Sequence, residues 1–448
     1  MPIAPTFDAT VHRRSSSSAV NRAVFYGVFS LLLFGPLAFG AVDPWSILVM
    51  EAGAVLLFVL WIVGEITWGE LQIAGSPLFP PMLAFAALVI LQLATGRTAY
   101  RYETLSGAML YVAYGLLCFL VVQCLRRTSQ VKTLAIAFSA YGFAVAMFAL
   151  IQSMSANGRL YWVRTPRFGG WIYGPYVNHN HYAGLMEMLA PIPLVFSLTR
   201  QARGPRRALA AAAGAVMAST IFLSGSRGGM AAFSIQMAVL AAVLIRRRKG
   251  RRTALALGVF LVIVIGLLAW LGGGELTSRM ASIHTEARRE LSGGMRMGVN
   301  RDGLKMFARK PLLGWGLGVF PDVYPQFRSF YTNFFVNEAH DDYLQLLVEM
   351  GALGFATMLW FVMVVYRSAM KKLGNWPEDT NGAVALAAVL GVTGILVHSF
   401  VDFNLQIPAN AALFYVLCVV AAMEPRFGLS RRKPVRRSEV VPELNSTR

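Results

Sequence analysis

The sequence predicts an all-α integral membrane protein with about twelve transmembrane helices. The first observation is composition: of the 448 residues, 56% are hydrophobic and 14% are charged, whereas about a quarter of a soluble domain is charged. The mean hydropathy is +0.54. The second observation is that the apolar runs are long and continuous, without the alternation that marks a membrane β-barrel. The third is that basic residues gather in alternate connections between the runs.

Each apolar run predicts one helix. The first run follows Arg13, Arg14 and Arg22 and resembles a signal peptide, but it is long for one and further runs follow, so we expect it to be retained. Residues 1–22 then form an N-terminal segment, and the Pro-, Arg- and Ser-rich residues 425–448 form a basic, disordered tail. The predicted spans are 23–40, 46–64, 80–96, 105–124, 133–153, 182–199, 207–223, 228–245 and 254–272, followed after a long loop by 353–369, 383–400 and 409–424.

The basic residues predict the orientation of the chain. Lys and Arg gather in the N-terminal segment, in the tail and in short connections such as LRRTSQVK, TRQARGPRR, RRRKGRR and RSAMKK. With twelve spans these all fall on one side, which the positive-inside rule assigns to the cytoplasm together with both termini. The net charge of +19 therefore reflects topology, and no nucleic-acid partner is expected. The three cysteines, Cys118, Cys124 and Cys418, lie in apolar runs and are interpreted as core residues without a disulfide.

The opposite side carries the long polar connections. Residues 273–352 form a loop of about eighty residues, and loops of that length are usually functional or disordered. This loop contains the amphipathic run MRMGVNRDGLKMFARK and ends in NEAHDDYLQLL. The segment 154–181 and the short connection SGSRGG, residues 224–229, face the same side. We therefore expect a functional site on this side.

His340 is a candidate general base. Asn337 is a plausible helix N-cap, and the helical spacing of His340 and Tyr343 predicts that His340 lies in the first turn. A helix N-terminus disfavours the imidazolium form, which would keep the ring neutral and able to accept a proton. Glu338 or Asp341 could orient the imidazole. The alternative is a histidine that only caps a helix or forms hydrogen bonds at the membrane interface.

Arginines on the same side are candidates for binding a diphosphate. Arg227 lies between two spans, among glycines that permit tight turns. An arginine near the lipid is costly unless it is paired or lies in a wet cavity, and a guanidinium group can bind phosphate oxygens through two parallel hydrogen bonds. The alternative for each is a solvated charge or a contact to a lipid headgroup. The further candidates in the two long loops are Arg164, Arg167, Arg296 and Arg301.

Two polar patches remain. Asn178, His179 and His181 open a span and predict hydrogen bonds to a sugar or a diphosphate. A His-x-His pair could suggest a metal, but zinc requires a third protein ligand and no HExxH or CxxC motif supplies one. No metal and no other cofactor are expected. The patch at 398–404, which contains His398 and Asp402, is interpreted as a structural polar network.

These residues fall in motifs that resemble a known family. NHNHYAG, SGSRGG, KPLLGWGLGVF, NEAHDDYLQLLVEMGALG and HSFVDFNLQIPAN occur in this order, with a long loop before the final spans. Over roughly residues 105–424 the sequence resembles the O-antigen ligase and polysaccharide polymerase superfamily. Members of this family are bacterial inner-membrane glycosyltransferases that need neither metal nor nucleotide. By position, the resemblance matches the family's essential histidine to His340, its arginine between spans to Arg227, and its loop arginine to Arg296, with Arg301 close by.

The resemblance implies transfer of a glycan from undecaprenyl diphosphate to a hydroxyl group at the periplasmic face. Arg227 and Arg296 would neutralise the departing diphosphate, and His340 would take the proton of the acceptor hydroxyl. The implied partners are the lipid-linked donor, membrane lipids, and an acceptor that is lipid A–core for a ligase or a growing polysaccharide for a polymerase. That choice stays open at this point.

A transporter or flippase is the alternative from another class. It would place ionisable residues at mid-membrane, where, apart from Glu51, we expect the spans to be nearly free of charge. A scaffold protein would not require the pattern of arginines and histidines.

Overall fold

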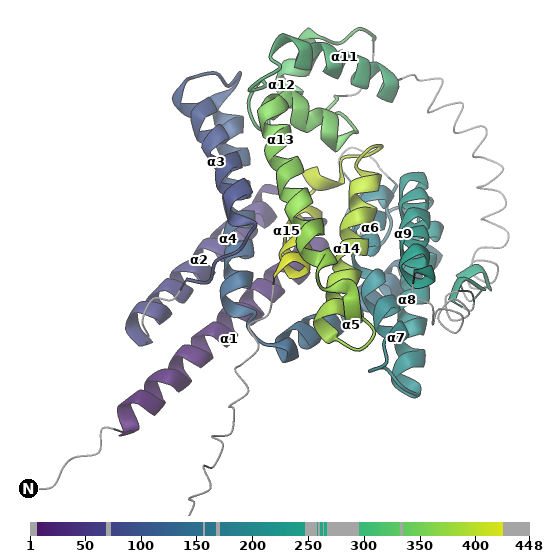
Figure 1. Ribbon diagram of the computed structural model, residues 1–448. Helices are drawn as coiled ribbons and strands as arrows, with labels where there is room; N and C mark the ends of the chain where they lie inside the picture. Colours follow the sequence, from purple (N-terminus) through teal and green to yellow (C-terminus); the bar gives the residue numbers. More distant parts are fainter. Residues whose placement is uncertain are drawn as a thin grey trace, which may run out of the picture.

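The computed structural model describes residues 7–68, 73–155, 157–166, 171–246, 258, 260–262, 264–266, 295–331 and 335–423. Within these ranges the chain is helical apart from turns, loops and two isolated β-bridges (Figure 1). Nine helices of the described part are long and apolar enough to cross a membrane. The prediction of an all-α, multi-pass membrane protein is confirmed.

The helices follow the predicted order. Every predicted span except the ninth coincides with one of them, with α6 and α7 together forming the sixth. The ninth span, 254–272, lies mostly outside the described residues, so the total of twelve stays a prediction. The bounds are α1 (Phe7–Leu37), α2 (Pro44–Trp68), α3 (Phe79–Ala94), α4 (Arg101–Cys124), α5 (Thr128–Met154), α6 (His179–Leu189), α7 (Pro191–Leu198), α8 (Pro205–Leu223), α9 (Arg227–Ile245), α11 (Met295–Arg309), α12 (Phe320–Val323), α13 (Asp342–Met370), α14 (Thr380–His398) and α15 (Pro408–Ala422), with short 3-10 turns at Tyr324–Gln326, Leu373–Asn375 and Asn404–Gln406.

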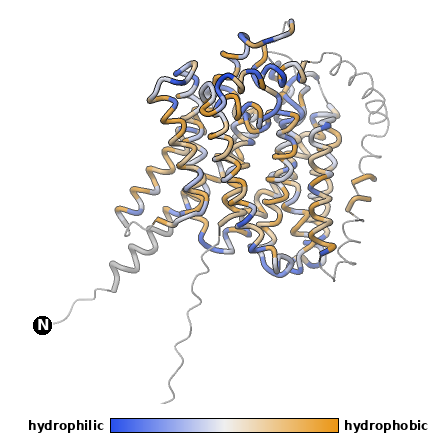
Figure 2. The backbone as a smooth tube through the Cα atoms, turned by 45° about the horizontal axis from the view of Figure 1, so that its top comes forward, coloured by the Kyte–Doolittle hydropathy of each residue, from blue (hydrophilic) through white to orange (hydrophobic). Residues whose placement is uncertain are grey.

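The connections gather at two ends of the helical bundle. Hydrophilic residues are concentrated at both ends, and hydrophobic residues lie between them (Figure 2). At the end opposite α11, called the lower end here, Arg200 Nη1 lies 2.7 Å from Glu378 Oε1 and Lys372 Nζ donates to the carbonyl of Met423 at 2.5 Å. These contacts join connections that are far apart in the sequence.

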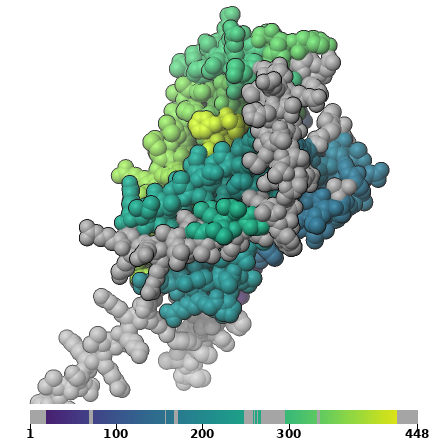
Figure 3. Space-filling model, turned by 90° about the vertical axis from the view of Figure 1, so that its right-hand side faces the viewer, coloured from purple at the N-terminus to yellow at the C-terminus, as the bar shows by residue number. Residues whose placement is uncertain are grey.

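The upper end holds the long polar connections in which the candidate site residues lie. The N–H of Ala409 donates to the carbonyl of Gly40 at 3.0 Å, and the N–H of Asp342 donates to the carbonyl of Ser399 at 2.9 Å. In the space-filling view the green residues of α11 and of the segment after it lie at this end, above the teal surface of the preceding helices (Figure 3). The described part of the long loop is therefore packed against the bundle.

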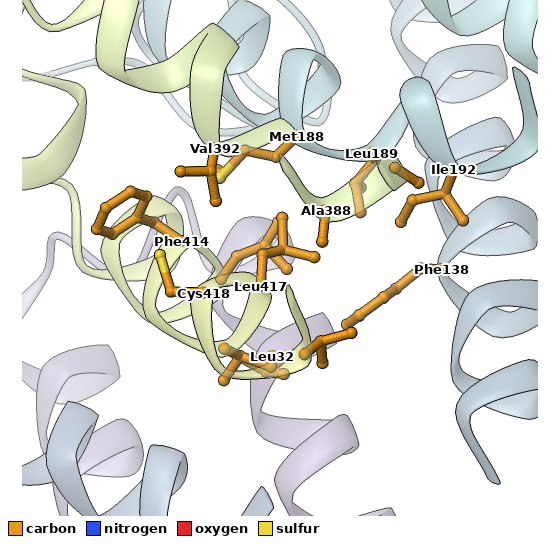
Figure 4. Packing of buried hydrophobic residues seen from close by; sticks show 14 of the residues in the cluster. Leu32, Phe138, Met188, Leu189, Ile192, Ala388, Val392, Phe414, Leu417 and Cys418 are labelled. Carbon is orange, nitrogen blue, oxygen red and sulfur yellow. The ribbon is translucent and has the colours of Figure 1, made fainter. Parts of the chain in front are cut away.

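The centre of the bundle is formed by α14 and α15. Nearly every residue of α15 is buried, because the helix packs against α1, α4, α6, α13 and α14. Leu417 and Cys418 of α15 lie between Leu32 of α1 and Val392 of α14 (Figure 4). Cys418, like the other two cysteines, is buried and free, as predicted for core residues.

The motif KPLLGWG is inserted into a break in α13. Gly351 has φ 65° and ψ −172°, which is not helical. The break frees backbone groups that the loop then uses, since the N–H of Trp315 donates to the carbonyl of Val348 at 3.0 Å and the N–H of Ala352 donates to that of Pro311 at 2.8 Å. The loop and the helix therefore satisfy each other's backbone hydrogen-bonding groups inside the protein, where unpaired groups are costly.

This insertion changes the predicted end of the long loop. We placed the loop at 273–352 and the next span at 353, but α13 begins at Asp342 and runs across the break at Gly351. The apolar pattern after the glycine marks the second part of the helix, and the polar residues before it belong to the first part.

Close packing at this insertion predicts that Gly314→Ala destabilises the protein. Gly314 has φ +70°, and a Cβ there would collide with the carbonyl group of Glu349. We expect a loss of about 1 kcal/mol from the backbone conformation and a further ~1–3 kcal/mol from the collision, measured by thermal unfolding in detergent. The matched control is Gly96→Ala, because Gly96 has φ +64° with no atom near the position of a Cβ. Equal losses in both variants would contradict the insertion.

Candidate functional site

A buried carboxylate at the upper end faces two imidazoles. Asp402 lies in the connection after α14 and its side chain is 2% exposed. Its Oδ1 lies 3.9 Å from His181 Nε2 and 3.9 Å from His340 Nδ1. His181 comes from the start of α6 and is buried, whereas His340 precedes α13 and its side chain is 32% exposed. The structure thus brings together residues from three separate motifs.

Phe403 fixes the orientation of both imidazoles. Its ring centroid lies 4.7 Å from that of His181 and 4.8 Å from that of His340, with interplanar angles of 76° and 78°. Edge-to-face contacts of this kind are favourable for aromatic rings. Two adjacent residues, Asp402 and Phe403, therefore position both histidines.

Asp402 is held in its charged form. Burial is the largest single influence and acts to raise the pKa of this carboxyl, whereas the imidazoles of His181 and His398 act to lower it. The N–H of Phe403, which donates to Oδ1 at 2.8 Å, and the guanidinium of Arg296 add to the lowering. The net pKa of Asp402 lies below its ordinary value, so a negative charge faces His340 at neutral pH.

His340 lies outside the first turn of α13, and the predicted N-cap is wrong. The N-cap is Asp341, whose carboxylate accepts hydrogen bonds from the N–H groups of Tyr343 and Leu344, each at 3.0 Å. Residues 335–339 carry no regular structure, so Asn337 lies too far from the helix to cap it. His340 itself has φ +55°, a conformation that costs a non-glycine residue about 1–3 kcal/mol and is often found at functional sites.

Glu338 contacts the helix that follows it. Its carboxylate accepts a short hydrogen bond from the Nε2 of Gln345, a buried residue of α13. Burial raises the pKa of Glu338 to about 8, and Glu349 adds to the effect. The carboxylate that the structure places beside His340 is Asp402, so Asp402 fits the orienting role that we expected of Glu338 or Asp341.

A second buried group supports the turn that carries Arg227. His398 Nδ1 lies 2.8 Å from Glu187 Oε1, and His398 Nε2 lies 3.4 Å from the hydroxyl of Ser226. All three side chains are almost fully buried. Ser226 is the N-cap of α9 and accepts a hydrogen bond from the N–H of Gly229 at 3.1 Å. The first turn of α9 therefore rests on a Glu–His pair supplied by α6 and α14.

The glycines of SGSRGG allow this close approach. A Cβ on Gly228 would lie 2.6 Å from His398 Nε2, and one on Gly229 would lie 2.8 Å from the Cβ of Ala183. Larger residues would push α9 away from the pair. Arg227 lies directly before these glycines, and its side chain is exposed at the upper end.

Arg296 of the long loop forms a hydrogen bond next to Asp402. It lies in the first turn of α11, and its Nη1 donates to the carbonyl of Val401 at 3.1 Å, next to Asp402. The same helix is anchored by Asp302, whose carboxylate accepts hydrogen bonds from the N–H and hydroxyl of Ser329 at 2.8 and 2.9 Å. Arg301 lies further along α11 and is exposed.

Arg164 lies apart from this group. Its guanidinium forms two hydrogen bonds with the carboxylate of Asp43, at 2.7 and 3.0 Å, and lies 4.0 Å from the ring centroid of Phe39. These contacts tie the segment after α5 to the connection between α1 and α2, and they favour a structural role over substrate binding. Arg167 lies outside the described residues.

Asn178 and His179 hold the start of α6. The side chain of Asn178 caps the helix by accepting from the N–H of Asn180 at 2.9 Å, and its Nδ2 lies 3.4 Å from His181 Nε2. His179 Nδ1 lies 2.9 Å from the carbonyl of Ser224. The NHNH motif therefore links the Asp402 group to the SGSRGG turn. Within the ranges that the structure describes, no three His, Cys, Asp or Glu side chains come together as metal ligands.

The positions of Asp402 and Glu187 in these two buried groups were not predicted from the sequence. We expected the spans to be nearly free of charge apart from Glu51, but Glu187 is buried in α6, and Glu349, which we placed in the long loop, is buried in α13. A lone acidic residue in an apolar helix is a candidate functional residue by default, so Glu187 could have been identified from the sequence. The pairing of Glu187 with His398 could not be predicted from the sequence, because 211 positions separate the two residues.

The pKa of Glu338 predicts a pH-dependent stability. The folded protein raises the pKa of Glu338 from 4.5 to about 8, so its Glu338 carboxyl binds a proton more tightly than the same group in the unfolded chain. The free energy of unfolding therefore falls as the pH rises through this interval. Glu338→Gln cannot ionise, so its unfolding midpoint should depend less on pH than that of the wild type between about pH 5 and 8. Parallel curves would show that the Glu338 carboxyl is ionised throughout.

Comparison with known proteins agrees with this architecture. Residues 185–359 match the model of a protein family described as O-Antigen ligase. The match includes Glu187, Arg227, Arg296 and His340, and it ends before Asp402. No curated protein matches the chain. This match and the membrane fold support membership of the O-antigen ligase superfamily, and they support a glycosyltransferase-like enzyme of the ligase or polymerase kind.

Proposed function

We propose that this protein transfers a glycan from undecaprenyl diphosphate to an acceptor hydroxyl, as an O-antigen ligase with lipid A–core as acceptor. The observation that carries the proposal is the placement of His340 beside the charged Asp402. Arg296 approaches the same connection from α11, and Arg227 lies in the turn supported by His398. A base, its counter-charge and two cations thus gather at one end of a membrane bundle.

His340 acts as the general base. Its Nδ1 faces Asp402, and we assign Nε2 the contact with the acceptor hydroxyl. As the hydroxyl oxygen attacks the anomeric carbon, its proton passes to Nε2, and Asp402 stabilises the imidazolium that forms. The distance of 3.9 Å is long for a hydrogen bond, and such contacts commonly tighten when substrate binds.

Arg227 and Arg296 act on the leaving group. When the new glycosidic bond forms, the bond between the anomeric carbon and the diphosphate oxygen breaks, and the electron pair leaves with the lipid diphosphate. Guanidinium groups bind such oxygens in pairs, and fixed positive charges stabilise the developing negative charge. The acceptor supplies the proton and the donor supplies the leaving group, so the step needs no cofactor.

The charge distribution supports a periplasmic location for the upper end. The connections at the lower end carry many basic residues, among them Arg126, Arg127, Arg200, Arg203, Arg206, Arg207, Lys371 and Lys372. By the positive-inside rule the lower end faces the cytoplasm. The protein is then a multi-pass protein of the inner membrane with both termini in the cytoplasm.

The acceptor is tested by the glycans of a deletion strain. Loss of all polysaccharide linked to lipid A, with lipid-linked polymer accumulating, is the expected result for a ligase. Chains shortened to single repeat units would instead identify a polymerase, which could use the same donor and the same side chains.

His340→Ala should reduce transfer by about 10²–10⁴-fold, because general-base catalysis contributes that much. The assay is glycan transfer from a synthetic undecaprenyl-diphosphate donor by purified protein in lipid nanodiscs. Asp402→Asn should lower the rate less, with little effect on the KM for donor, because Asp402 acts through His340. Arg309→Ala, at the end of α11, serves as the control. Transfer by His340→Ala at the wild-type rate would assign the base to another residue, and His181 would be next.

Arg227→Lys should impair transfer nearly as much as Arg227→Ala. Lysine keeps the charge but replaces the planar pair of donors with a single point of contact, so the two-point grip on a diphosphate is lost. The matched control is Arg200→Lys at the lower end, where an exposed ion pair should tolerate the change. Wild-type donor affinity and rate in Arg227→Lys, at equal protein level, would show that Arg227 does not bind the diphosphate.

A further inference from the structure

A pocket at the upper end has no assigned role. It lies where α5 ends, between that helix and the segment that leads to α6, and its volume is about 390 Å³, within the ~300–1,000 Å³ usual for small-molecule sites. Gln152 and Ser153 line it from α5, Arg159 from the following turn, and Trp171 and Gly174 from the approach to α6. None of these residues belongs to the group around Asp402.

We propose that this pocket is a subsite for one pyranose ring of the donor glycan, an inference that rests on the proposed glycan transfer. A pyranose presents an apolar face of C–H groups and an edge of hydroxyl groups. It is recognised by a flat aromatic ring together with hydrogen-bonding groups beside it, and this pocket supplies both.

Trp171 provides the aromatic surface. It stacks on the ring of His179, with centroids 4.6 Å apart and an interplanar angle of 25°, which fixes the plane of the indole. The side chain remains 39% exposed and lines the pocket. A rigid aromatic side chain that is already held in place can bind a sugar with little loss of conformational entropy.

Gln152, Ser153 and Arg159 provide the polar groups. Gln152 is 4% exposed, and its Oε1 has no hydrogen-bond partner within the described residues, although a buried amide oxygen is normally paired. Its Nε2 donates to the carbonyl of Arg159 at 3.2 Å, which directs the amide toward the turn that bounds the pocket. Ser153 and Arg159 are exposed beside it. A hydroxyl-rich ligand satisfies such a set better than an apolar one.

The composition of the pocket also argues against a lipid chain. The apolar cavity of the bundle, about 680 Å³ between α2, α3, α4, α13 and α15, is lined almost throughout by aliphatic and aromatic side chains. An acyl or polyprenyl chain fits that lining. The pocket at Trp171 differs from it in its amide, hydroxyl and guanidinium groups.

The position of the pocket favours the donor glycan. A Cβ on Gly225 would lie 3.5 Å from the indole of Trp171, and His179, on which Trp171 stacks, contacts the carbonyl of Ser224. Trp171 therefore adjoins the turn that carries Arg227. A glycan whose diphosphate is bound at Arg227 can extend directly across the indole.

The test measures glycan binding without the lipid diphosphate. The probe is the soluble repeat-unit oligosaccharide released from the host's own surface polysaccharide, and the full-length protein is held in nanodiscs. Saturation-transfer NMR should detect binding to the wild type. Trp171→Ala should weaken it about tenfold or more, and Trp171→Phe should retain most of it. Trp162→Ala is the matched control, because Trp162 is 36% exposed at the same end and lies outside the pocket. Gln152→Leu, which keeps the size of the side chain, is a second variant and should also weaken binding.

The outcomes separate this inference from the proposed function. His340→Ala should bind the oligosaccharide like the wild type while it loses transfer. No binding to the wild type, or equal binding by Trp171→Ala and the wild type, would overturn the subsite even if transfer is demonstrated. Binding that depends on Trp171 in a protein that transfers no glycan would overturn the proposed reaction and leave the subsite in place.

Discussion

The buried pair of Glu187 and His398 is the interaction on which the arrangement of the upper end depends. It joins α6 to α14 inside the bundle, and the first turn of α9 packs directly on it through Ser226 and two glycines. Four residues beyond His398, the N–H of Asp402 donates to the His398 carbonyl at 3.1 Å, so the position of Asp402 is tied to the same histidine. Removing one partner of a buried pair leaves the other without compensation and costs about 3–5 kcal/mol. The position of Asp402 and the position of the turn that carries Arg227 therefore both depend on this one buried contact.

The long loop gains its rigidity from a different source. Its backbone fills the break in α13, and Gln92 of α3 donates to the carbonyl of Glu349 at 2.9 Å in the same place. Asp302 fixes α11 to the segment around Ser329. As a result Arg296 and His340, which come from opposite ends of the described loop, are presented on supported backbone. Preorganised groups of this kind need little rearrangement when charge develops in a reaction.

The sequence predicted the spans well because length and hydropathy are local properties. It also identified His340, Arg227 and Arg296 as candidates, since polar residues are conspicuous beside apolar runs. It misplaced the N-cap of α13 because Asn337 and Asp341 are both good caps, and the choice between them depends on packing. It interpreted Asp402 as structural because its contacts with His181 and His340 join motifs that are far apart in the chain. The break at Gly351 was not predicted either, because it depends on the packing of a loop, residues 311–316, that is not adjacent to it in the sequence.

The burial of α15 has a consequence for how the protein is made. This helix lies in the middle of the bundle, against α1, α4, α6 and α14, yet the ribosome produces it after all of them. The earlier helices enter the bilayer without their central partner, so they must leave room for it or separate again when it arrives. Asp402 and Phe403 are translated just before α15 and after every other residue of the site around them. The nascent protein therefore lacks Asp402 and Phe403 until α14 has been translated, so translation order itself delays completion of this group of residues.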